Sequence, residues 1–384
     1  MPTPAGPLAG VRVLELAGLG ALPFGTLKLA DMGADVIRVH RVGDVPAAPP
    51  ASHHSEWDRG RRSVAIDLKQ PEGVELLLTL VERVDALCEA FRPGVAERLG
   101  VGPDAALARN PRLVYGRLTG WGQDGPLAQA AAHSINYESI VGAVGSIGPV
   151  GGPPVSLLQV LGDFAGGGMH LAFGVVCALL EAQRSGRGQV VDVAMVDGVA
   201  SIYTPFYSMA RSGMHTDDIG TNLFDGGAPF YNVYETADGK FVSVAPIEPH
   251  FYAVLLDKLG VDPASLPDQY DQSRWPEVRE RFAAIFRERT RDEWCARLES
   301  TDACFAPVMR LGEAPDHAHN VARNMFVPGA DGRPEVAPAP RFSRTPGAPR
   351  PSYRYEGADT DAVLTDLGLS TDEITNLRAS ATIA

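Results

Sequence analysis

The alternation of apolar runs and glycine turns at the start of the chain constrains the fold more than any other feature. Residues 11–16 (VRVLEL) have the length and composition of a buried strand, residues 17–34 combine a glycine-rich turn with a helix, and residues 35–41 (DVIRVHR) return to a strand. Two strands that are joined through a helix lie parallel in one sheet. The alternation continues beyond residue 185, so we predict an α/β fold with a parallel, Rossmann-like sheet.

The pattern changes in the second half of the chain. Residues 230–247 (FYNVYETADGKFVSVAPI) predict two strands joined by a turn at Asp238–Gly239, and helical patterns follow around 249–259, 275–289 and 291–299. We therefore predict a large domain, a linker and a smaller α+β domain. Their limits are 1–210 with 326–384 for the large domain, 211–225 for the linker and 226–325 for the small domain.

Composition argues against several classes of function. The formal net charge of −13, from 34 basic and 47 acidic side chains, is unfavourable for general binding to nucleic acid or to anionic membranes. The four cysteines are far apart and form no CxxC motif, which predicts reduced thiols in a cytoplasmic protein. The chain start lacks the features of a signal peptide, and we interpret the apolar run at 169–180 as a buried helix that is too short to span a bilayer.

Motifs for metal and dinucleotide chemistry are weak. The first turn contains Gly18 and Gly20 but no third glycine at the dinucleotide spacing, so we do not expect NAD binding. The histidines that stand close together in sequence lack the cysteines or acids of a metal site; they are His53, His54, His317 and His319. We expect no metal and no redox cofactor.

Two turn-rich stretches each contain one ionisable side chain of interest. Residues 115–137 lead to His133, and imidazole changes protonation near neutral pH. Residues 158–169 (LQVLGDFAGGGM) contain Asp163, three following glycines at 166–168 and the start of an apolar run. We predict a helix that begins near Asp163 and ends near residue 183, with first-turn N–H groups that hold an oxyanion and glycines that let a ligand approach. Taken alone, His133 is more simply explained as structural and Asp163 as a helix cap.

Basic residues of the first α/β part form a second constellation, consisting of Arg38, Arg61, Arg62, Lys69 and Arg92. Ligands of open α/β sheets bind at the carboxyl ends of the strands, and arginine is suited to paired contacts with phosphate. We expect these side chains to bind a large anionic ligand, although any one of them alone is more simply explained as solvated charge.

Motifs along nearly the whole chain together resemble one family. They are LAGVRVLELAGLG, DMGADVIRV, GRRSVAIDLK, FRPG, GRLTGWGQDGP, HSINY, GDFAGGG, SGRGQVVDVAMVDG, GGAPFYNVYETADGKFVSV, IEPHFY and PRFSRT. The sequence resembles the family III (CaiB/BaiF) CoA-transferases, and within them the α-methylacyl-CoA racemases. The resemblance implies a Rossmann-like domain built from both chain ends, an inserted small domain, and an interlocked homodimer with active sites between the large domain of one subunit and the small domain of the other.

The resemblance also implies roles for particular residues. His133 of HSINY and Asp163 of GDF would be the two bases, and Glu248 of IEP, contributed by the partner subunit, would support the histidine. The side chains that we expect to bind CoA are Arg38, Arg62, Lys69, Arg92 and Tyr137.

Inversion of an α-carbon beside a thioester needs one base on each face of a planar enolate. We therefore predict an α-methylacyl-CoA racemase, an isomerase that moves a proton at C2 of a 2-methylacyl-CoA. The alternative is CoA transfer to a carboxylic acid through an acyl anhydride on Asp163, a reaction that does not need His133. Ser134 and Gln159 stand where the racemase pattern has Asp and Asn. These departures leave a third possibility, an acyl-CoA-binding homologue with weak catalysis.

Overall fold

The computed structural model describes residues 6–48, 50 and 55–384, and it divides into two compact units. The first unit takes in the chain up to Val141, then Leu157–Ile202 and Asn324–Ala384. The second unit takes in Gly142–Ser156 and Tyr203–Arg323, so it includes the segment that we expected to be a linker. The limits of the predicted domains remain a prediction.

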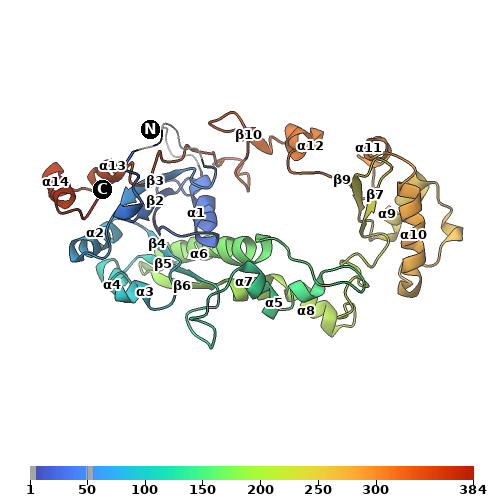
Figure 1. Ribbon diagram of the computed structural model, residues 1–384, viewed down its shortest axis with the longest axis horizontal. Coiled ribbons are helices and arrows are strands. Elements are labelled where there is room, and N and C mark those ends of the chain that lie inside the picture. Colours follow the sequence, from blue (N-terminus) through green and yellow to red (C-terminus); the bar gives the residue numbers. More distant parts are fainter. Residues whose placement is uncertain (1–5, 49, 51–54) are drawn as a thin grey trace. The chain divides into compact units, whose positions relative to one another are not determined.

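The first unit is built around a parallel sheet of six strands, which confirms the predicted fold class (Figure 1). The strand order is β3-β2-β1-β4-β5-β6, the order of doubly wound nucleotide-binding folds. Such sheets bind ligands where the order reverses, beside the carboxyl ends of the strands next to β1. The strands are β1 (Arg12–Leu16), β2 (Asp35–His40), β3 (Arg61–Ala65), β4 (Ala86–Glu89), β5 (Val114–Thr119) and β6 (Gln189–Ala194).

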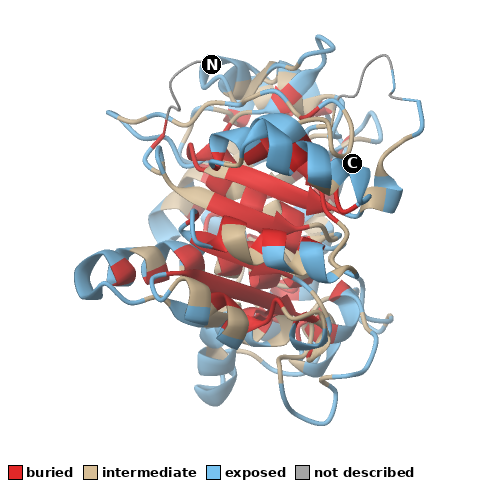
Figure 2. Ribbon diagram, turned by 90° about the vertical axis from the view of Figure 1, so that its left-hand side faces the viewer, coloured by how far each residue is buried: buried red, intermediate tan, exposed pale blue. Residues whose placement is uncertain are grey.

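Successive residues of a strand face opposite layers of helices. Val13 belongs to the core under α1 and α6, whereas its neighbour Leu14 belongs to the core under α2, α4, α13 and α14. Both residues are fully buried, and Figure 2 shows the strands as a buried layer between partly exposed helices. Burial on both faces explains why these strands read as nearly continuous apolar runs.

The helices of the first unit are α1 (Ala21–Asp31), η1 (Val42–Asp44), α2 (Pro71–Val81), α3 (Val95–Arg98), α4 (Pro103–Arg109), α5 (Ser134–Ile140), η3 (Val160–Met169), α6 (His170–Ser185), α7 (Met195–Ile202), α13 (Thr360–Asp366) and α14 (Thr371–Ala379). The expected return segment at 326–350 contains a short antiparallel hairpin of β10 (Phe326–Pro328) and β11 (Pro334–Val336).

The helix that carries Asp163 is longer than predicted. The π-helical turns of η3 continue directly into α6, so the helical run begins at Val160. This run of 26 residues is long and apolar enough to cross a membrane by length and composition. However, α6 packs on the sheet through Leu171 and Val175, while Phe173 and Leu180 are 69% and 49% exposed. The helix that we predicted to be buried is therefore buried on one face only, because only that face meets the sheet.

The second unit contains the predicted hairpin. Strands β7 (Asn232–Glu235) and β8 (Phe241–Val244) pair antiparallel, and β8 also pairs with β9 (Phe305–Val308). The sequence did not indicate β9, which contains Pro307, and proline is tolerated only at a sheet edge or bulge. The helices pack on an aromatic core that includes Phe230, Trp275 and Phe282.

The helices of this unit are η2 (Val144–Ser146), α8 (Thr204–Arg211), α9 (Pro249–Leu259), η4 (Pro263–Ser265), η5 (Gln272–Arg274), α10 (Trp275–Phe286), α11 (Arg291–Leu298), η6 (Ala314–Asp316) and α12 (Ala318–Ala322).

Candidate active site

The structure brings His133 and Asp163 together in the first unit. His133 is the residue directly before α5, and Asp163 lies in the first turn of η3. The hydroxyl of Ser134, which follows His133, accepts a hydrogen bond from the backbone N–H of Asp163 at 3.2 Å. The two side chains also interact electrostatically. The predicted pair of an imidazole and a carboxylate therefore lies close together in one unit.

The environment of Asp163 favours a protonated carboxyl group. The side chain lies beside Gly20, the residue that starts α1: a Cβ at Gly20 would stand 3.3 Å from Oδ2 of Asp163. Burial raises the pKa of Asp163, the nearby His133 lowers it, and the nearby Glu138 raises it again; the resulting pKa lies above its ordinary value. A carboxyl group with a raised pKa exchanges its proton closer to neutral pH.

Three N–H groups at the start of this helix, where we predicted an oxyanion site, are engaged within the protein. The N–H of Gly162 donates to Oε1 of Glu138 at 2.8 Å, and the N–H of Asp163 donates to Ser134. The next N–H, that of Phe164, donates to the carbonyl of Gln159. Side chains of α5 and the helix itself therefore already satisfy these three donors, and the oxyanion site remains a prediction.

The three glycines after Asp163 serve helix packing rather than ligand approach. A Cβ at Gly167 would lie 2.9 Å from the Cβ of Ala21, and one at Gly168 would lie 2.7 Å from the Ala21 carbonyl oxygen. On the other side, a Cβ at Gly166 would lie 2.9 Å from Val199 of α7. Our interpretation of these glycines is corrected accordingly: they let α1 and α7 approach the backbone of η3.

Tyr137 supports the segment that carries His133. It is buried, its hydroxyl donates to the carbonyl of Ala132 at 2.7 Å, and its ring meets Trp121 edge-on at 4.7 Å between centroids. Burial, together with the nearby Asp163, raises the pKa of Tyr137 to about 12. The contact with CoA that we expected from Tyr137 remains a prediction.

Two of the predicted basic residues are exposed beyond the carboxyl ends of strands. Lys69 follows β3 and Arg92 follows β4. Their strands β3 and β4 are separated by β2 and β1, so the two strands lie three spacings, or roughly 14 Å, apart in the sheet. An elongated anion with more than one phosphate could meet both.

The Arg38 side chain forms hydrogen bonds and ion pairs with other residues of the same unit. Its guanidinium donates to Oδ1 of Asp58 and to the carbonyl of Gly18, both at 2.8 Å, and its Nε lies 3.5 Å from Oε1 of Glu15. The second oxygen of the Glu15 carboxylate accepts from the buried Arg61 at 2.7 Å. These two arginines therefore hold the loop that follows β1, the loop that leads to Gly20 beside Asp163.

Arg62 is not brought together with Lys69 and Arg92. It is the second residue of β3, near the amino end of the sheet, and it pairs with Asp35 and Asp366 at 2.5 and 3.2 Å.

Glu248 lies in the second unit, where it is the exposed residue directly before α9. Among the described residues, no group of three or more His, Cys, Asp or Glu side chains could hold a metal ion. His317 instead lies 2.9 Å from Glu299, and His53 and His54 fall outside the described residues.

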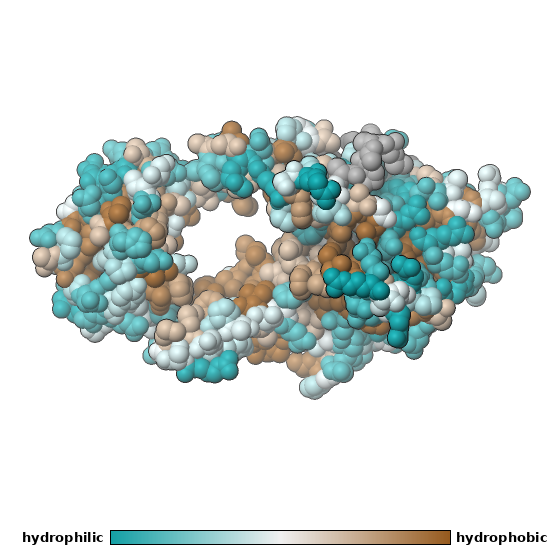
Figure 3. Space-filling view, turned by 180° about the vertical axis from the view of Figure 1, so that it is seen from behind, coloured by the Kyte–Doolittle hydropathy of each residue, from teal (hydrophilic) through white to brown (hydrophobic). Residues whose placement is uncertain are grey.

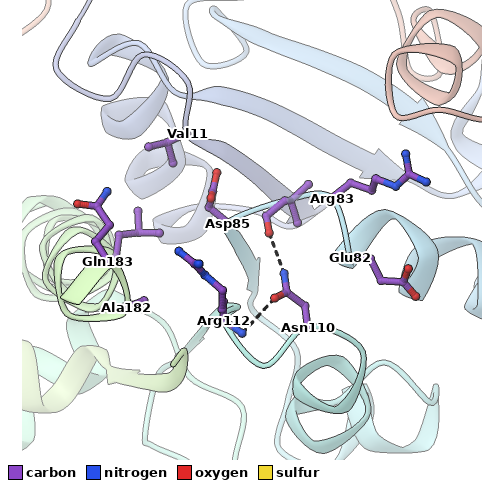
Figure 4. A pocket seen from close by; sticks show the side chains of 10 residues that line it. Val11, Glu82, Arg83, Asp85, Asn110, Arg112, Ala182 and Gln183 are labelled. Atoms are coloured by element: carbon purple, nitrogen blue, oxygen red, sulfur yellow. Dashed lines mark hydrogen bonds between the residues drawn. The ribbon is translucent and has the colours of Figure 1, made fainter. Parts of the chain in front are cut away.

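A cavity of about 340 Å³ opens at the opposite, amino end of the sheet (Figure 4). Asn110 lines this cavity; its side-chain amide donates to the carbonyl of Val84 and accepts from the N–H of Arg112. None of the residues that we predicted to be functional lines this cavity.

Glu138 is the site residue that sequence reasoning missed. It is fully buried, it contacts Ser134 and Gly162, and it acts electrostatically on Asp163. The available signal was its spacing: Ser134 and Glu138 are four residues apart and so share one face of a helix.

Comparison with known proteins shows which proteins this chain is similar to. Residues 8–360 match CoA-transferase family III. The chain is 43% identical to the α-methylacyl-CoA racemase of Mus musculus, over 97% of this chain and 96% of that protein. It is 40% identical to the α-methylacyl-CoA racemase of Homo sapiens, over 98% and 97%. A CaiB/BaiF family protein from Brucella suis has the same fold, with a TM-score of 0.77 and 24% identity over 94% of this chain and 100% of that one.

Proposed function

The chain belongs to the family III CoA-transferases, and from this premise we propose that it is an α-methylacyl-CoA racemase. Relatives that carry this name are 40–43% identical over nearly the whole chain. The observation that carries the proposal is the proximity of His133 and Asp163, joined through the Ser134 hydroxyl.

In the proposed reaction, one of these two residues removes the C2 proton and the other returns a proton to the opposite face of the enolate. Each residue is the base for one enantiomer and the acid for the other. The raised pKa of Asp163 supports this double role, because its carboxyl group must hold a proton in one direction and accept one in the other. The proton transfers need only these side chains, and CoA enters as part of the substrate.

We further propose that Lys69 and Arg92 contact the phosphates of CoA. Both side chains are exposed beyond strand ends, whereas the donors of Arg38 and Arg62 are engaged with carboxylates. The proposed contribution of Arg38 is therefore to hold the loop after β1, and that of Tyr137 is to support the histidine segment.

We also propose a homodimer in which Glu248 of the partner subunit supports His133. The exposed face of the long helix favours such an assembly: Met169, Phe173, Val176 and Leu180 recur every three or four residues and are 39–69% exposed. Apolar stripes of this size are usually covered by a partner. Further apolar areas reach the surface, as Figure 3 shows in brown. Sedimentation at micromolar concentration tests this assembly, and a monomer would contradict it.

Exchange of the C2 proton in deuterated water tests the proposed reaction. We expect ¹H NMR to show exchange with both enantiomers of a 2-methylacyl-CoA, across a panel of acyl chains. His133→Ala should slow exchange with one enantiomer by about 10²–10⁴-fold, and Asp163→Ala should slow exchange with the other enantiomer by a similar factor. Absence of exchange with every acyl-CoA would contradict the racemase proposal. Transfer of CoA to a carboxylic acid, with hydroxylamine trapping of an acyl group on Asp163 and full activity of His133→Ala, would support the transferase instead.

A further inference from the structure

Two hydrogen bonds tie α5 to the first turn of η3, and a third, within α5, links their two acceptors. The Ser134 hydroxyl donates to Oε1 of Glu138 at 2.7 Å, and the N–H of Gly162 donates to the same oxygen at 2.8 Å. The N–H of Asp163 donates in turn to the Ser134 hydroxyl. The backbone that carries one proposed base is therefore fixed to the helix that begins directly after the other, His133.

The local sequence is built for this connection. Ser134 and Glu138 lie one turn apart, so both side chains point to the same face of α5. They are 3% and 0% exposed. Gly162 permits the approach, because a Cβ there would lie 2.9 Å from Oε1 of Glu138.

The Glu138 carboxylate is an unusual group to bury. Its second oxygen, Oε2, is buried without a hydrogen-bond partner in the part of the chain that the structure describes. Within that part, no Lys, Arg or His forms an ion pair with Glu138 either. A buried carboxylate without a cation is costly for stability, so its presence beside Asp163 calls for a reason other than stability.

Building on the proposed racemase reaction, we propose that Glu138 is a positioning residue of the active site. It holds Asp163 against His133 through Ser134 and Gly162, and its negative charge opposes a second negative charge on Asp163. The Asp163 carboxyl group thereby stays ready to donate a proton as well as to accept one.

Among the charged residues around Asp163, Glu138 is the one whose charge raises the pKa of the Asp163 carboxyl group. Burial raises the pKa of Asp163, His133 lowers it, and Glu138 raises it again. The titratable residues that face Asp163 from α5 and its start are His133, Tyr137 and Glu138.

The other elements that pack on η3 contribute no charge that acts on the pKa of Asp163. From the strands, the charged residues are Asp192 of β6 and Arg117 of β5, which pairs with Glu89 and Glu97. From α1, the nearest residue is Gly20, while Lys28 and Asp31 lie near the far end of that helix. The titratable residue of α7 is Asp197, and that of the first turn of α6 is His170, whose Nδ1 lies 2.8 Å from the carbonyl oxygen of Ala165. Neither perturbs the pKa of Asp163.

Glu138→Gln separates charge from geometry. Glutamine keeps an oxygen that can accept from Gly162 and Ser134, but it carries no charge. For the enantiomer that Asp163 deprotonates, we expect the acidic limb of the pH–rate profile to move to lower pH, while KM stays unchanged. For the enantiomer that His133 deprotonates, Asp163 acts as the acid, so the alkaline limb of that profile should also move to lower pH. Ser139→Ala is the matched control on the same helix, because that hydroxyl bonds the exposed turn at Ile135 and should leave both profiles unchanged.

Ser134→Ala tests the positioning role and serves if Glu138→Gln does not fold. It keeps the Glu138 charge but removes the bond to the Asp163 backbone, so we expect a lower rate, by up to about 10²-fold, at an unchanged pH limb. Wild-type profiles and rates in both folded variants would overturn the proposal.

A ¹³C NMR titration of the Asp163 carboxyl group separates this proposal from the proposed function. If the wild type exchanges no C2 proton, the racemase proposal fails. A lower titration midpoint of Asp163 in Glu138→Gln would still support the charge effect, and an unchanged midpoint would contradict it.

Discussion

Replacement of Gly168 by alanine should weaken the fold and the active site together. Gly168 lies where η3 and α1 pack tightly: a Cβ there would lie 2.7 Å from both the Ala21 carbonyl oxygen and Cδ1 of Phe24. Ordinary van der Waals contact begins at 3.4 Å, so α1 must move by about 0.7 Å. The backbone oxygen cannot be avoided by a change of rotamer.

Such overpacking costs about 1–3 kcal/mol. The gain in helix propensity from glycine to alanine offsets up to about 1 kcal/mol of this cost. We therefore expect Gly168→Ala to lower the free energy of unfolding by about 1–2 kcal/mol. Because Gly20, the residue directly before α1, lies beside the Asp163 carboxyl group, the same shift should slow C2-proton exchange by up to about 10²-fold.

Urea unfolding and the exchange assay measure the two effects. Gly145→Ala is the control, since a Cβ there meets nothing within 4 Å, and we expect its stability to stay within about 0.5 kcal/mol of wild type. If Gly168→Ala matched the wild type in urea midpoint and rate, the close contact between η3 and α1 would not control the site.

Two further predictions concern charged residues. Arg92→Ala should raise KM for the acyl-CoA with little change in kcat. Arg62→Ala, which removes a partner of Asp35, should leave KM unchanged and lower the free energy of unfolding by at most about 1 kcal/mol. Steady-state kinetics at fixed ionic strength test this difference, and equal effects of the two variants on KM would contradict it. Asp163→Asn should be more stable than wild type at neutral pH. The raised pKa means that the folded state binds more protons than the unfolded state, so wild-type stability falls as pH rises from the ordinary carboxyl pKa through the raised value, a loss that asparagine avoids. Unfolding curves from pH 4 to pH 8 check this, and a constant difference across that range would count against it.

The fold was accessible from sequence because its signals are local. Apolar runs of strand length alternate with helical stretches, and Pro249 marks the first residue of α9, as prolines often do. Strand β9 was missed because Pro307 breaks the strand pattern, and only its place at the sheet edge makes it acceptable.

The site was harder to predict from the sequence, because the same residue types serve different physical purposes. Three consecutive glycines fit ligand approach and helix packing equally well, and only the positions of α1 and α7 decide between them. Arg62 lies within β3 near its amino end, whereas Lys69 lies beyond the carboxyl end of the same strand. Since ligands bind at the carboxyl end of a parallel sheet, a difference of a few residues in sequence position makes Lys69 a candidate phosphate contact and Arg62 a structural ion-pair partner.

The two departures from the racemase pattern acquire different meanings in three dimensions. Gln159 is exposed at the start of η3, where its carbonyl accepts from Phe164, so its side chain is free of the packing. Ser134 is buried 2.7 Å from the Glu138 carboxylate. An aspartate at position 134 would place a second carboxylate against Glu138, and two such groups at this distance cannot both be ionised. Ser134 and Glu138 therefore belong together: the hydroxyl bridges to Asp163, and the negative charge comes from one turn further along the helix. This substitution adjusts how the acid–base pair is held and charged, so its consequence should appear in the pH dependence of the reaction rather than in the choice of acyl chain.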